Sequence, residues 1–457
     1  MPPRAGSPNG RIRAIGLRSS QSLTEPDPGF FGVVLAAYIA VTISRIHEVI
    51  PVLTRLYLGK VSAAALLVAA FTIPGSEFQR VFKTPVAKYV VILTVIAIAS
   101  VPGSAWPRQS FSFFQDWWPQ VMLMFVCVCA GFANKRTADL CLVTLTLSAG
   151  FAALMTMATG HVDSGGRAFI GNHYAATYDA NMSAALFVCA LPYAAMLAIR
   201  TGWTRWAGIA VIPVLIAATL ATASRGGVLA LGVLAITTIV FAPKQHRGKY
   251  IVLLVLAMAI APFLPHSGLA QRWAEFMQPG GDYNMTSRDG RIEVWKRGIG
   301  FMLTHPILGV GVRSYEIAGG ATAHSWVNAH NAFIQVGAEL GVGGLVVFVM
   351  TVAAALRLAL HARRRLTGDN LTPDEEMARN LFTAAFSSLV AVLASAMFLS
   401  MAYDGITLFA LAVPTGLALS FRSAGRQSPA GTRAPSARGN ATGWRTNRVV
   451  RRVNAVQ

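Results

Sequence analysis

Three short motifs of the sequence hold side chains that could perform one kind of chemistry together. Arg225 stands in ATASRGGVLAL, Arg291 in SRDGRIEVWKRG and His330 in AHNAFIQVGAELG. An arginine fork binds phosphate bidentately and keeps its charge. A neutral histidine can accept a proton from a hydroxyl group. The set therefore suits the attack of an alcohol on a carbon that carries a diphosphate leaving group.

Two of these residues also have simpler interpretations. Arg225 lies at a sharp reversal between two apolar segments, which we attribute to Gly226 and Gly227, and it could merely reach the lipid headgroups. His330 is expected at the N-terminus of a helix, where the helix dipole favours the neutral imidazole. A capping or structural histidine would suit the same position.

The elements that must position these residues are membrane helices. The chain has 457 residues, of which 54% are hydrophobic and 13% charged, whereas a soluble chain carries about 25% charged residues. The apolar residues form long continuous runs, which indicates a polytopic membrane protein. Backbone groups in the hydrocarbon must be paired internally, and these runs lack the two-residue alternation of barrel strands. An all-α fold is therefore expected.

About twelve transmembrane helices are predicted, and they form one domain over residues 29–421. Arg45, His47 and Glu48, in the polar connector after the first helix, predict a local ion pair. Asp404 is expected to cap the last helix, and the four cysteines are expected to pack in the core. The predicted segments are 30–44, 60–74, 88–102, 117–133, 138–159, 180–199, 206–223, 226–242, 249–264, 331–357, 380–402 and 405–421.

Lysine and arginine in the connections predict the orientation. With the N-terminus in the cytoplasm, alternate connections fall inside, and each of them is basic: FQRVFKTPVAK, NKR, RTGWTR, PKQHRGK and HARRRLTGDN. Both termini are then cytoplasmic. The long segment 265–330 lies outside, and His330 marks the external end of its helix.

Segment 265–330 departs from the rule that outer connections carry few cations. A long loop can cross the membrane regardless of its charge, or these cations could bind an anionic ligand. Residues 291–304 are predicted to form a helix along the membrane surface, with Arg291 and Trp295 on one face because they are four residues apart. The cations of the segment are Arg272, Arg288, Arg291, Lys296, Arg297 and Arg313.

The two ends of the chain carry much of the formal charge of +20. Residues 1–28 and 422–457 are rich in arginine and poor in apolar clusters, so we expect disordered cytoplasmic tails. Such tails would favour an anionic membrane surface, and nucleic acid is not expected as a partner. The first 28 residues lack the apolar stretch of a signal peptide.

The outer face of an inner membrane offers no nucleotide, so a donor there must arrive already activated, as a lipid diphosphate-linked sugar does. The motifs SRGG, GRIEVWKRGIGFMLTHPILGVGVRSYE and HNAFIQVGAELGVGG occur in this order over roughly residues 180–350. In order and spacing they resemble the O-antigen ligase and polymerase superfamily of lipid-linked glycan transferases.

The resemblance implies a bacterial inner-membrane glycosyltransferase of lipopolysaccharide or exopolysaccharide assembly. Such an enzyme moves an undecaprenyl-diphosphate-linked glycan onto an acceptor hydroxyl at the periplasmic face, with no metal and no cofactor. By this resemblance Arg225 and Arg291 hold the diphosphate, and His330 activates the acceptor. A single direct displacement would invert the anomeric carbon. A ligase would use lipid A-core as the acceptor and a polymerase another lipid-linked glycan, and the shared motifs do not separate the two.

The same site has further candidate residues. Arg288, Arg167, Asp179 and Asn331 are candidates for substrate contact, and the segment around Asp179 resembles a family Asp-Pro-Asn element in which Ala180 replaces proline. Glu339 lies nine residues beyond His330, about 13 Å deeper along a helix, and is expected to join helices or to bind an unwound turn near Gly337 and Gly341.

A transporter or flippase of lipid-linked sugars is the alternative from another class. Transporters place charges near the midplane of the bilayer and often contain inverted repeats. Here the arginines cluster at the external edge and no repeat is visible, which favours the transferase.

Overall fold

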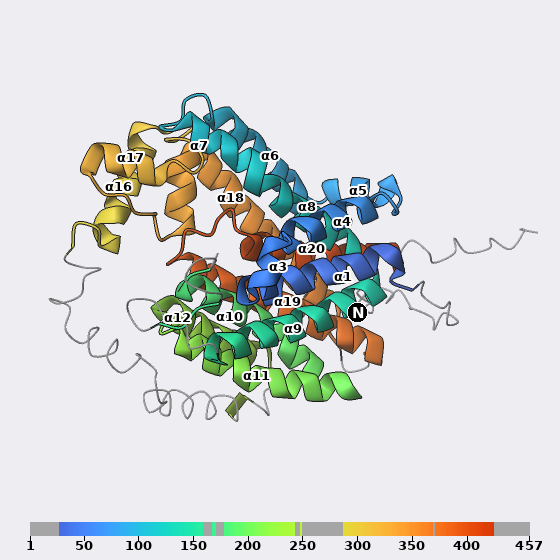
Figure 1. Ribbon diagram of the computed structural model, residues 1–457. Coiled ribbons are helices and arrows are strands. Elements are labelled where there is room, and N and C mark those ends of the chain that lie inside the picture. Colours follow the sequence, from blue (N-terminus) through green and yellow to red (C-terminus); the bar gives the residue numbers. More distant parts are fainter. Residues whose placement is uncertain are drawn as a thin grey trace, which may run out of the picture.

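The computed structural model describes residues 27–158, 167–170, 178–242, 247–248, 287–368 and 371–424. Within these residues all regular elements are helical (Figure 1). The helices are α1 (Gly29–Ser44), α2 (Ile46–Val49), α3 (Pro51–Arg55), α4 (Leu58–Ala70), α5 (Gly75–Phe82), α6 (Pro85–Ser100), α7 (Pro107–Ser112), the π-helix η1 (Phe113–Trp117), α8 (Trp118–Gly131), α9 (Lys135–Ala158), α10 (Ala180–Ala198), α11 (Trp203–Ala221), α12 (Arg225–Phe241), α16 (Arg291–Thr304), α17 (Tyr315–Ala323), α18 (Ala332–Arg365), α19 (Pro373–Ala396) and α20 (Gly405–Ala424).

The helices agree in type with the predicted membrane segments but not in their number of spans. Eleven of the twelve predicted segments contain a helix, and 249–264 lies outside the described residues. Five described helices, α9, α10, α11, α18 and α19, are long and apolar enough to cross a membrane. The pair α4 and α5 would make a sixth, but it bends by 105°. An all-helical membrane fold is thus confirmed, whereas the count of twelve is not.

One predicted span is wrong at its end. Segment 380–402 was expected to be helical throughout, yet α19 ends at Ala396. Residues 397–404, Met397–Asp404, form an irregular connector before α20. Their sequence MFLSMAYD is mostly apolar, so composition alone extended the helix too far. Most of the expected tails lies outside the described residues. Asp27 and Pro28 precede α1, and residues 422–424, which were predicted to be disordered, are helical because α20 continues to Ala424.

The predicted external segment 265–330 meets other chain reversals at one end of the helical bundle, which we call the motif face: the start of the connector after α1, the regions around Ser104, Asn181 and Ser224, and residues 397–404. Residues far apart in the sequence contact one another there. Arg45 Cζ lies 4.7 Å from the centroid of the Tyr178 ring, Ser104 Oγ lies 2.7 Å from Ser314 Oγ, and Val312 N donates to Ser100 Oγ at 3.1 Å. Ser224 Oγ donates to Asn181 Oδ1 at 2.8 Å, and His330 N donates to Ser400 Oγ at 2.8 Å. Figure 1 shows α16 and α17 beside the ends of α6 and α18, on this face.

The connections predicted to be internal meet one another as well. Ion pairs join Lys135 to Asp374 at 3.1 Å, Arg200 to Asp139 at 2.8 Å, and Arg136 to Asp27, and Arg80 Nη2 donates to Leu419 O at 3.2 Å. Connections assigned to the same predicted side therefore contact one another in the described part of the chain, and the orientation itself stays a prediction.

Helix α18 is broken at Gly341, whose φ of 73° and ψ of −175° lie outside the helical region. The exposed backbone groups pair with the segment that follows α16: Val310 N donates to Ala338 O at 2.9 Å, Gly311 N to Glu339 O at 3.0 Å, and Val342 N to Pro306 O at 2.9 Å. A break inside a membrane helix is tolerated where other protein groups satisfy the freed backbone. The segment Pro306–Gly311 does so here.

Buried side chains agree with three local expectations. The four cysteines are all buried, and none of them forms a disulfide, as expected for packing residues. Arg45 and Glu48 form the expected ion pair near Tyr178, and Asp404 Oδ1 accepts a hydrogen bond from Ile406 N at 2.9 Å at the start of α20. Burial raises the pKa of Asp404 to about 6.

Candidate active site

Arg225 is the first residue of α12, and its position is fixed by the cap before it. Ser224 Oγ accepts a hydrogen bond from Gly227 N at 3.1 Å, which satisfies one of the free N–H groups of the helix end. The same hydroxyl meets Asn181 Oδ1 at 2.8 Å. The start of α12 is therefore tied to the start of α10.

The reversal before Arg225 is made differently from the prediction. The residue with positive φ is Ala223, at 47°, whereas Gly226 and Gly227 lie inside α12. A Cβ atom on Gly227 would meet Ala184 Cβ at 2.7 Å, and one on Gly226 would meet Phe398 Cβ at 3.4 Å. Gly227 therefore serves close packing, Gly226 makes ordinary van der Waals contact with Phe398, and neither glycine makes the turn.

Asp179 and Ala180 start α10 beside this point. Asp179 Oδ1 accepts from Met182 N at 2.8 Å and is the N-cap, and Ala180 takes the first helical position. Proline is favoured at that position because its missing N–H is not needed there. Alanine also begins a helix well, so the departure from the Asp-Pro-Asn pattern leaves the cap intact.

Arg291 is the first residue of α16, the helix that the sequence predicted over the same residues, 291–304. Its guanidinium carbon lies 5.5 Å from the centroid of the Phe398 ring. The Trp295 ring lies 6.4 Å from the same ring. Arg291 and Trp295 therefore share a face of α16, as their spacing predicted, and that face meets the connector Met397–Asp404.

His330 precedes α18 and is held in an unusual backbone conformation. Its φ is 47°, in the left-handed region, which costs a residue other than glycine about 1–2 kcal/mol. Its backbone N–H donates to Ser400 Oγ at 2.8 Å. The N-cap of α18 is the next residue, Asn331, whose Oδ1 accepts from Phe333 N at 2.9 Å and Ile334 N at 3.1 Å.

The half-buried imidazole of His330 lies close to two charged side chains. Burial lowers the pKa of His330 below its usual value, the positive charge of Arg291 lowers it further, and the negative charge of Asp179 raises it. The direction is the one expected from the sequence. Burial is the largest cause, and the charge of Arg291 adds to it.

Two contributors to the site were missed by the sequence reasoning. Phe398 meets α12 at Gly226 and α16 at Arg291, and Ser400 meets the backbone of His330. Both lie in the connector Met397–Asp404, which the prediction had placed inside a membrane helix. The available signal was the change from apolar residues to the sequence YDG, at the end of this connector.

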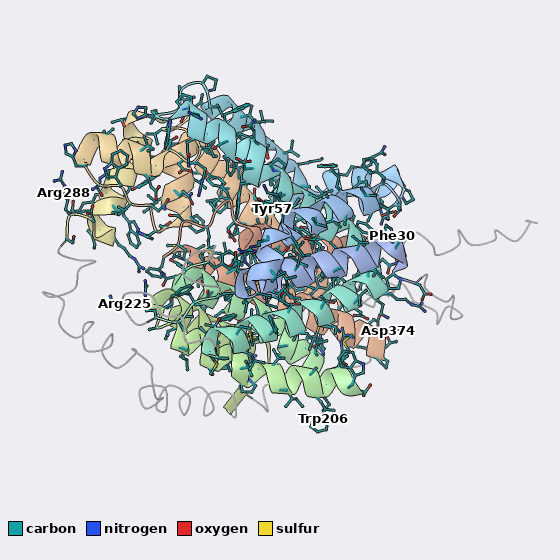
Figure 2. All side chains as sticks on the ribbon, viewed as in Figure 1. Phe30, Tyr57, Trp206, Arg225, Arg288 and Asp374 are labelled. Carbon is teal, nitrogen blue, oxygen red and sulfur yellow. The ribbon has the colours of Figure 1, made fainter. Side chains whose placement is uncertain are left out.

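The remaining candidates are placed less centrally. Arg288 is exposed, and its carbonyl accepts from Arg297 Nη2 at 3.4 Å. In Figure 2 Arg288 lies at the outer edge of the molecule, whereas Arg225 projects from the start of α12. Arg167 lies in the short segment 167–170, whose Ala168 N donates to Ala221 O at 3.3 Å, at the end of α11. Asn331 Oδ1 serves the α18 cap. A role of these residues in substrate contact stays a prediction.

Glu339 is buried deeper, beside the break in α18. Its Oε1 accepts a hydrogen bond from Tyr315 N at 3.4 Å, and its backbone carbonyl accepts from Gly311 N at 3.0 Å. Tyr403 lies in the same buried surroundings. Burial raises the pKa of Tyr403, and the negative charge of Glu339 raises it further. The Glu339 side chain thus contacts the start of α17, next to the unwound turn.

Taken together, His330 and Arg291 contact the same connector, His330 through Ser400 and Arg291 through Phe398. The Phe398 side chain also lies beside Gly226 at the start of α12. Such a set can bind an anionic group and accept a proton from a nearby hydroxyl. Among the described residues no group of three or more His, Cys, Asp or Glu side chains could hold a metal ion.

The apolar helices and their arrangement define an integral membrane protein with its polar site at one end of the bundle. Residues 210–349 match the family model described as O-antigen ligase, which confirms the resemblance of this chain to the O-antigen ligase superfamily and indicates a ligase-like function in membrane glycan assembly. The matched segment contains Arg225, Arg291 and His330, whereas Met397–Asp404 lies beyond it. No curated protein matches the chain.

Proposed function

We propose that this protein is a glycosyltransferase of the bacterial inner membrane. It moves an undecaprenyl-diphosphate-linked glycan onto a hydroxyl of lipid A-core at the periplasmic face. The observation that carries the proposal is that residues 397–404 contact both His330, at Ser400 Oγ, and Arg291, at the Phe398 ring. Burial and the charge of Arg291 favour the neutral imidazole of His330. A base that must accept a proton at neutral pH needs that protonation state.

The reaction we propose is one direct displacement. The acceptor hydroxyl attacks the anomeric carbon of the glycan while His330 accepts its proton. A new carbon–oxygen bond forms to the acceptor, and the bond from the anomeric carbon to the diphosphate oxygen breaks. Undecaprenyl diphosphate leaves with the bonding electron pair. A single displacement inverts the configuration of the anomeric carbon.

The two arginines take the role of stabilising the leaving group. Negative charge grows on the diphosphate as the bond breaks, and fixed guanidinium groups in a site of low dielectric stabilise such charge. Arg291 is supported by the Phe398 ring, and Arg225 by the Ser224 cap of α12. These positive charges are the reason we assign no metal ion to the reaction.

The acceptor is tested by deleting the gene and separating the surface glycans of the cells on a gel. A ligase deletion removes all long chains from lipid A-core, while lipid-linked chains remain. Single repeats left on the core would instead mean a polymerase that joins lipid-linked repeat units. A plasmid copy should restore the long chains, and the same plasmid carrying His330→Ala should not.

Chemistry is separated from transport by purified protein in detergent, which offers no compartments. The full chain is mixed with an undecaprenyl-diphosphate-linked glycan and lipid A-core, and the product is followed by mass. We expect glycosylated lipid A-core and free undecaprenyl diphosphate in equal amounts. No reaction with any hydroxyl acceptor would contradict the transferase proposal and favour a flippase. Release of undecaprenyl diphosphate without glycosylated acceptor would also contradict it, and would show that water attacks the donor.

A further inference from the structure

The connector Met397–Asp404 is fixed at both of its ends. At its start, Phe398 N donates to Ser395 O at 2.9 Å, in the last turn of α19. Near its end, Thr407 Oγ1 donates to Met401 O at 2.7 Å and Trp117 Nε1 donates to Tyr403 O at 3.0 Å. Helices α19 and α20 and the π-helix η1 therefore hold this connector in place. An element anchored in this way can fix the position of what it touches.

Ser400 touches the backbone of His330 at the point where the chain turns. The φ of 47° at His330 directs its N–H away from α18 and toward the connector, where Ser400 Oγ accepts it at 2.8 Å. A left-handed histidine persists only where its surroundings hold it. The cap of α18 cannot do so alone, because Asn331 Oδ1 is occupied by Phe333 N and Ile334 N.

Phe398 touches the two cationic helix starts from the same connector. The ring lies 5.5 Å from Arg291 Cζ and 6.4 Å from the Trp295 ring. The Phe398 Cβ lies against Gly226, next to Arg225, where an added Cβ would come within 3.4 Å. One side chain thus sets the distance between the start of α12 and the first turn of α16.

We propose that Ser400 and Phe398 are positioning residues for the transfer reaction, and that this connector aligns the base with the diphosphate-binding arginines. The proposal rests on the proposed function. Ser400 fixes the direction of the His330 side chain through its backbone, and Phe398 fixes the guanidinium of Arg291. Neither residue contacts the reacting atoms itself, and both lie outside the segment 210–349 that matches the O-antigen ligase family.

The two residues should affect different kinetic constants. Ser400 acts through the base, so its loss should lower kcat and leave donor binding unchanged. Misplacement of a catalytic group by about 1 Å costs up to roughly 100-fold in rate. Phe398 acts through an arginine that binds the donor, so its loss should raise the donor KM by about three- to thirty-fold, the range expected for a cation–π contact.

The experiment measures kcat, the KM for donor and acceptor, and donor binding without acceptor, for purified full-length variants. Ser400→Ala removes the acceptor of the His330 N–H, and Ser400→Thr keeps a hydroxyl and should restore kcat. Ser395→Ala is the matched control, because Ser395 is a buried serine in the last turn of α19 whose hydroxyl has no hydrogen-bond partner in the described part of the chain. Phe398→Leu keeps the apolar contact with Gly226 and removes the ring, and Met397→Ala is its exposed neighbour.

A double variant ties the effect to the base. If Ser400 acts only through His330, Ser400→Ala should lower the residual rate of His330→Ala no further. We expect Ser400→Ala to lose about 10- to 100-fold in kcat, with the donor KM, the binding of donor and the melting temperature close to wild type. Ser395→Ala and Met397→Ala should retain wild-type kinetics.

The remaining outcomes overturn either this proposal or the one beneath it. Wild-type kcat for Ser400→Ala, an equal loss in the absence of His330, or loss of the folded protein in both Ser400 variants would each exclude the positioning role. An unchanged donor KM for Phe398→Leu would exclude the positioning role of Phe398. Full turnover by His330→Ala would overturn the proposed function itself, whatever the Ser400 variants show.

Discussion

The backbone N–H of Val342 donates to the carbonyl of Pro306 at 2.9 Å, across the break in α18. This bond exists because Gly341 leaves the helical region and lets the segment after α16 approach the helix backbone. The long outer segment that carries Arg291 is in this way fastened to the helix that follows His330. The break in α18 therefore serves to hold two parts of the site together.

The first prediction concerns Gly341. Its φ of 73° and ψ of −175° are accessible almost only to glycine, and a Cβ would lie 2.5 Å from Pro306 O. Gly341→Ala should lower the free energy of unfolding by about 1–3 kcal/mol and loosen the Arg291 segment. Heating the purified protein in detergent and measuring the folded fraction would show this. Gly343→Ala is the control, since nothing lies within 4 Å of its Cβ position, and a loss there equal to that of Gly341→Ala would contradict the argument.

The second prediction concerns the arginines. Arg225→Lys and Arg291→Lys keep the charge but lose the planar fork, so a bidentate contact with diphosphate cannot form. A lost hydrogen bond to a charged group corresponds to about 1.5–3 kcal/mol, or roughly 10- to 100-fold in kcat/KM. The exposed Arg108→Lys, at a residue with no predicted role in the site, should change kcat/KM far less. Near-normal transfer by both Lys variants would exclude the diphosphate assignment. A loss in Arg291→Lys alone would leave Arg225 as a residue that only reaches the headgroups.

The third prediction concerns the orientation of the bundle. Cysteines placed at Ser287 and at Thr367 lie on connections predicted to be external and internal. Intact spheroplasts treated with an impermeant thiol reagent should label the cysteine at Ser287 and leave the one at Thr367 unlabelled until the membrane is opened. The four native cysteines are buried and should react little. Equal labelling of both positions in intact cells would exclude the orientation, and with it a periplasmic site.

Much of the fold could be predicted because the bilayer restricts the choice of structure. Continuous apolar runs must form helices there, and helix α16 began and ended at the predicted residues because its polar and apolar residues alternate with helical period. The charges in the connections predicted which helix ends lie on the same side, and two such connections are joined by the ion pair of Lys135 with Asp374.

The sequence could not predict features that depend on packing between distant segments. Residues 397–402 are as apolar as a membrane helix, and only the contacts of Phe398 and Ser400 show that the chain is irregular there. Gly226 and Gly227 were attributed to a turn, because a glycine that allows close packing leaves the same trace in a sequence as one that needs positive φ. An unwound turn was expected near Gly337 and Gly341, but its exact place at Gly341 depends on hydrogen bonds with residues 306–311.

The last prediction concerns the pH dependence of transfer. A general base must be neutral, so the rate is full above the pKa of His330 and is lost as the pH falls through it. The usual histidine pKa is about 6.5, and burial followed by the charge of Arg291 lowers it in this site. The acid limb of kcat/KM should therefore lie below that value. His330→Ala should lose about 10²–10⁴-fold in rate, and its residual rate should lack this limb.

Asp179 supplies the control that assigns the limb to His330. Its negative charge raises the pKa of His330, so Asp179→Asn should move the acid limb to still lower pH. Asparagine caps a helix as well as aspartate does, and the start of α10 should therefore persist, which the melting temperature would verify. An acid limb that stays in place in Asp179→Asn, or that survives in His330→Ala, would belong to another group. His330 would then be a residue that orients the acceptor without accepting its proton.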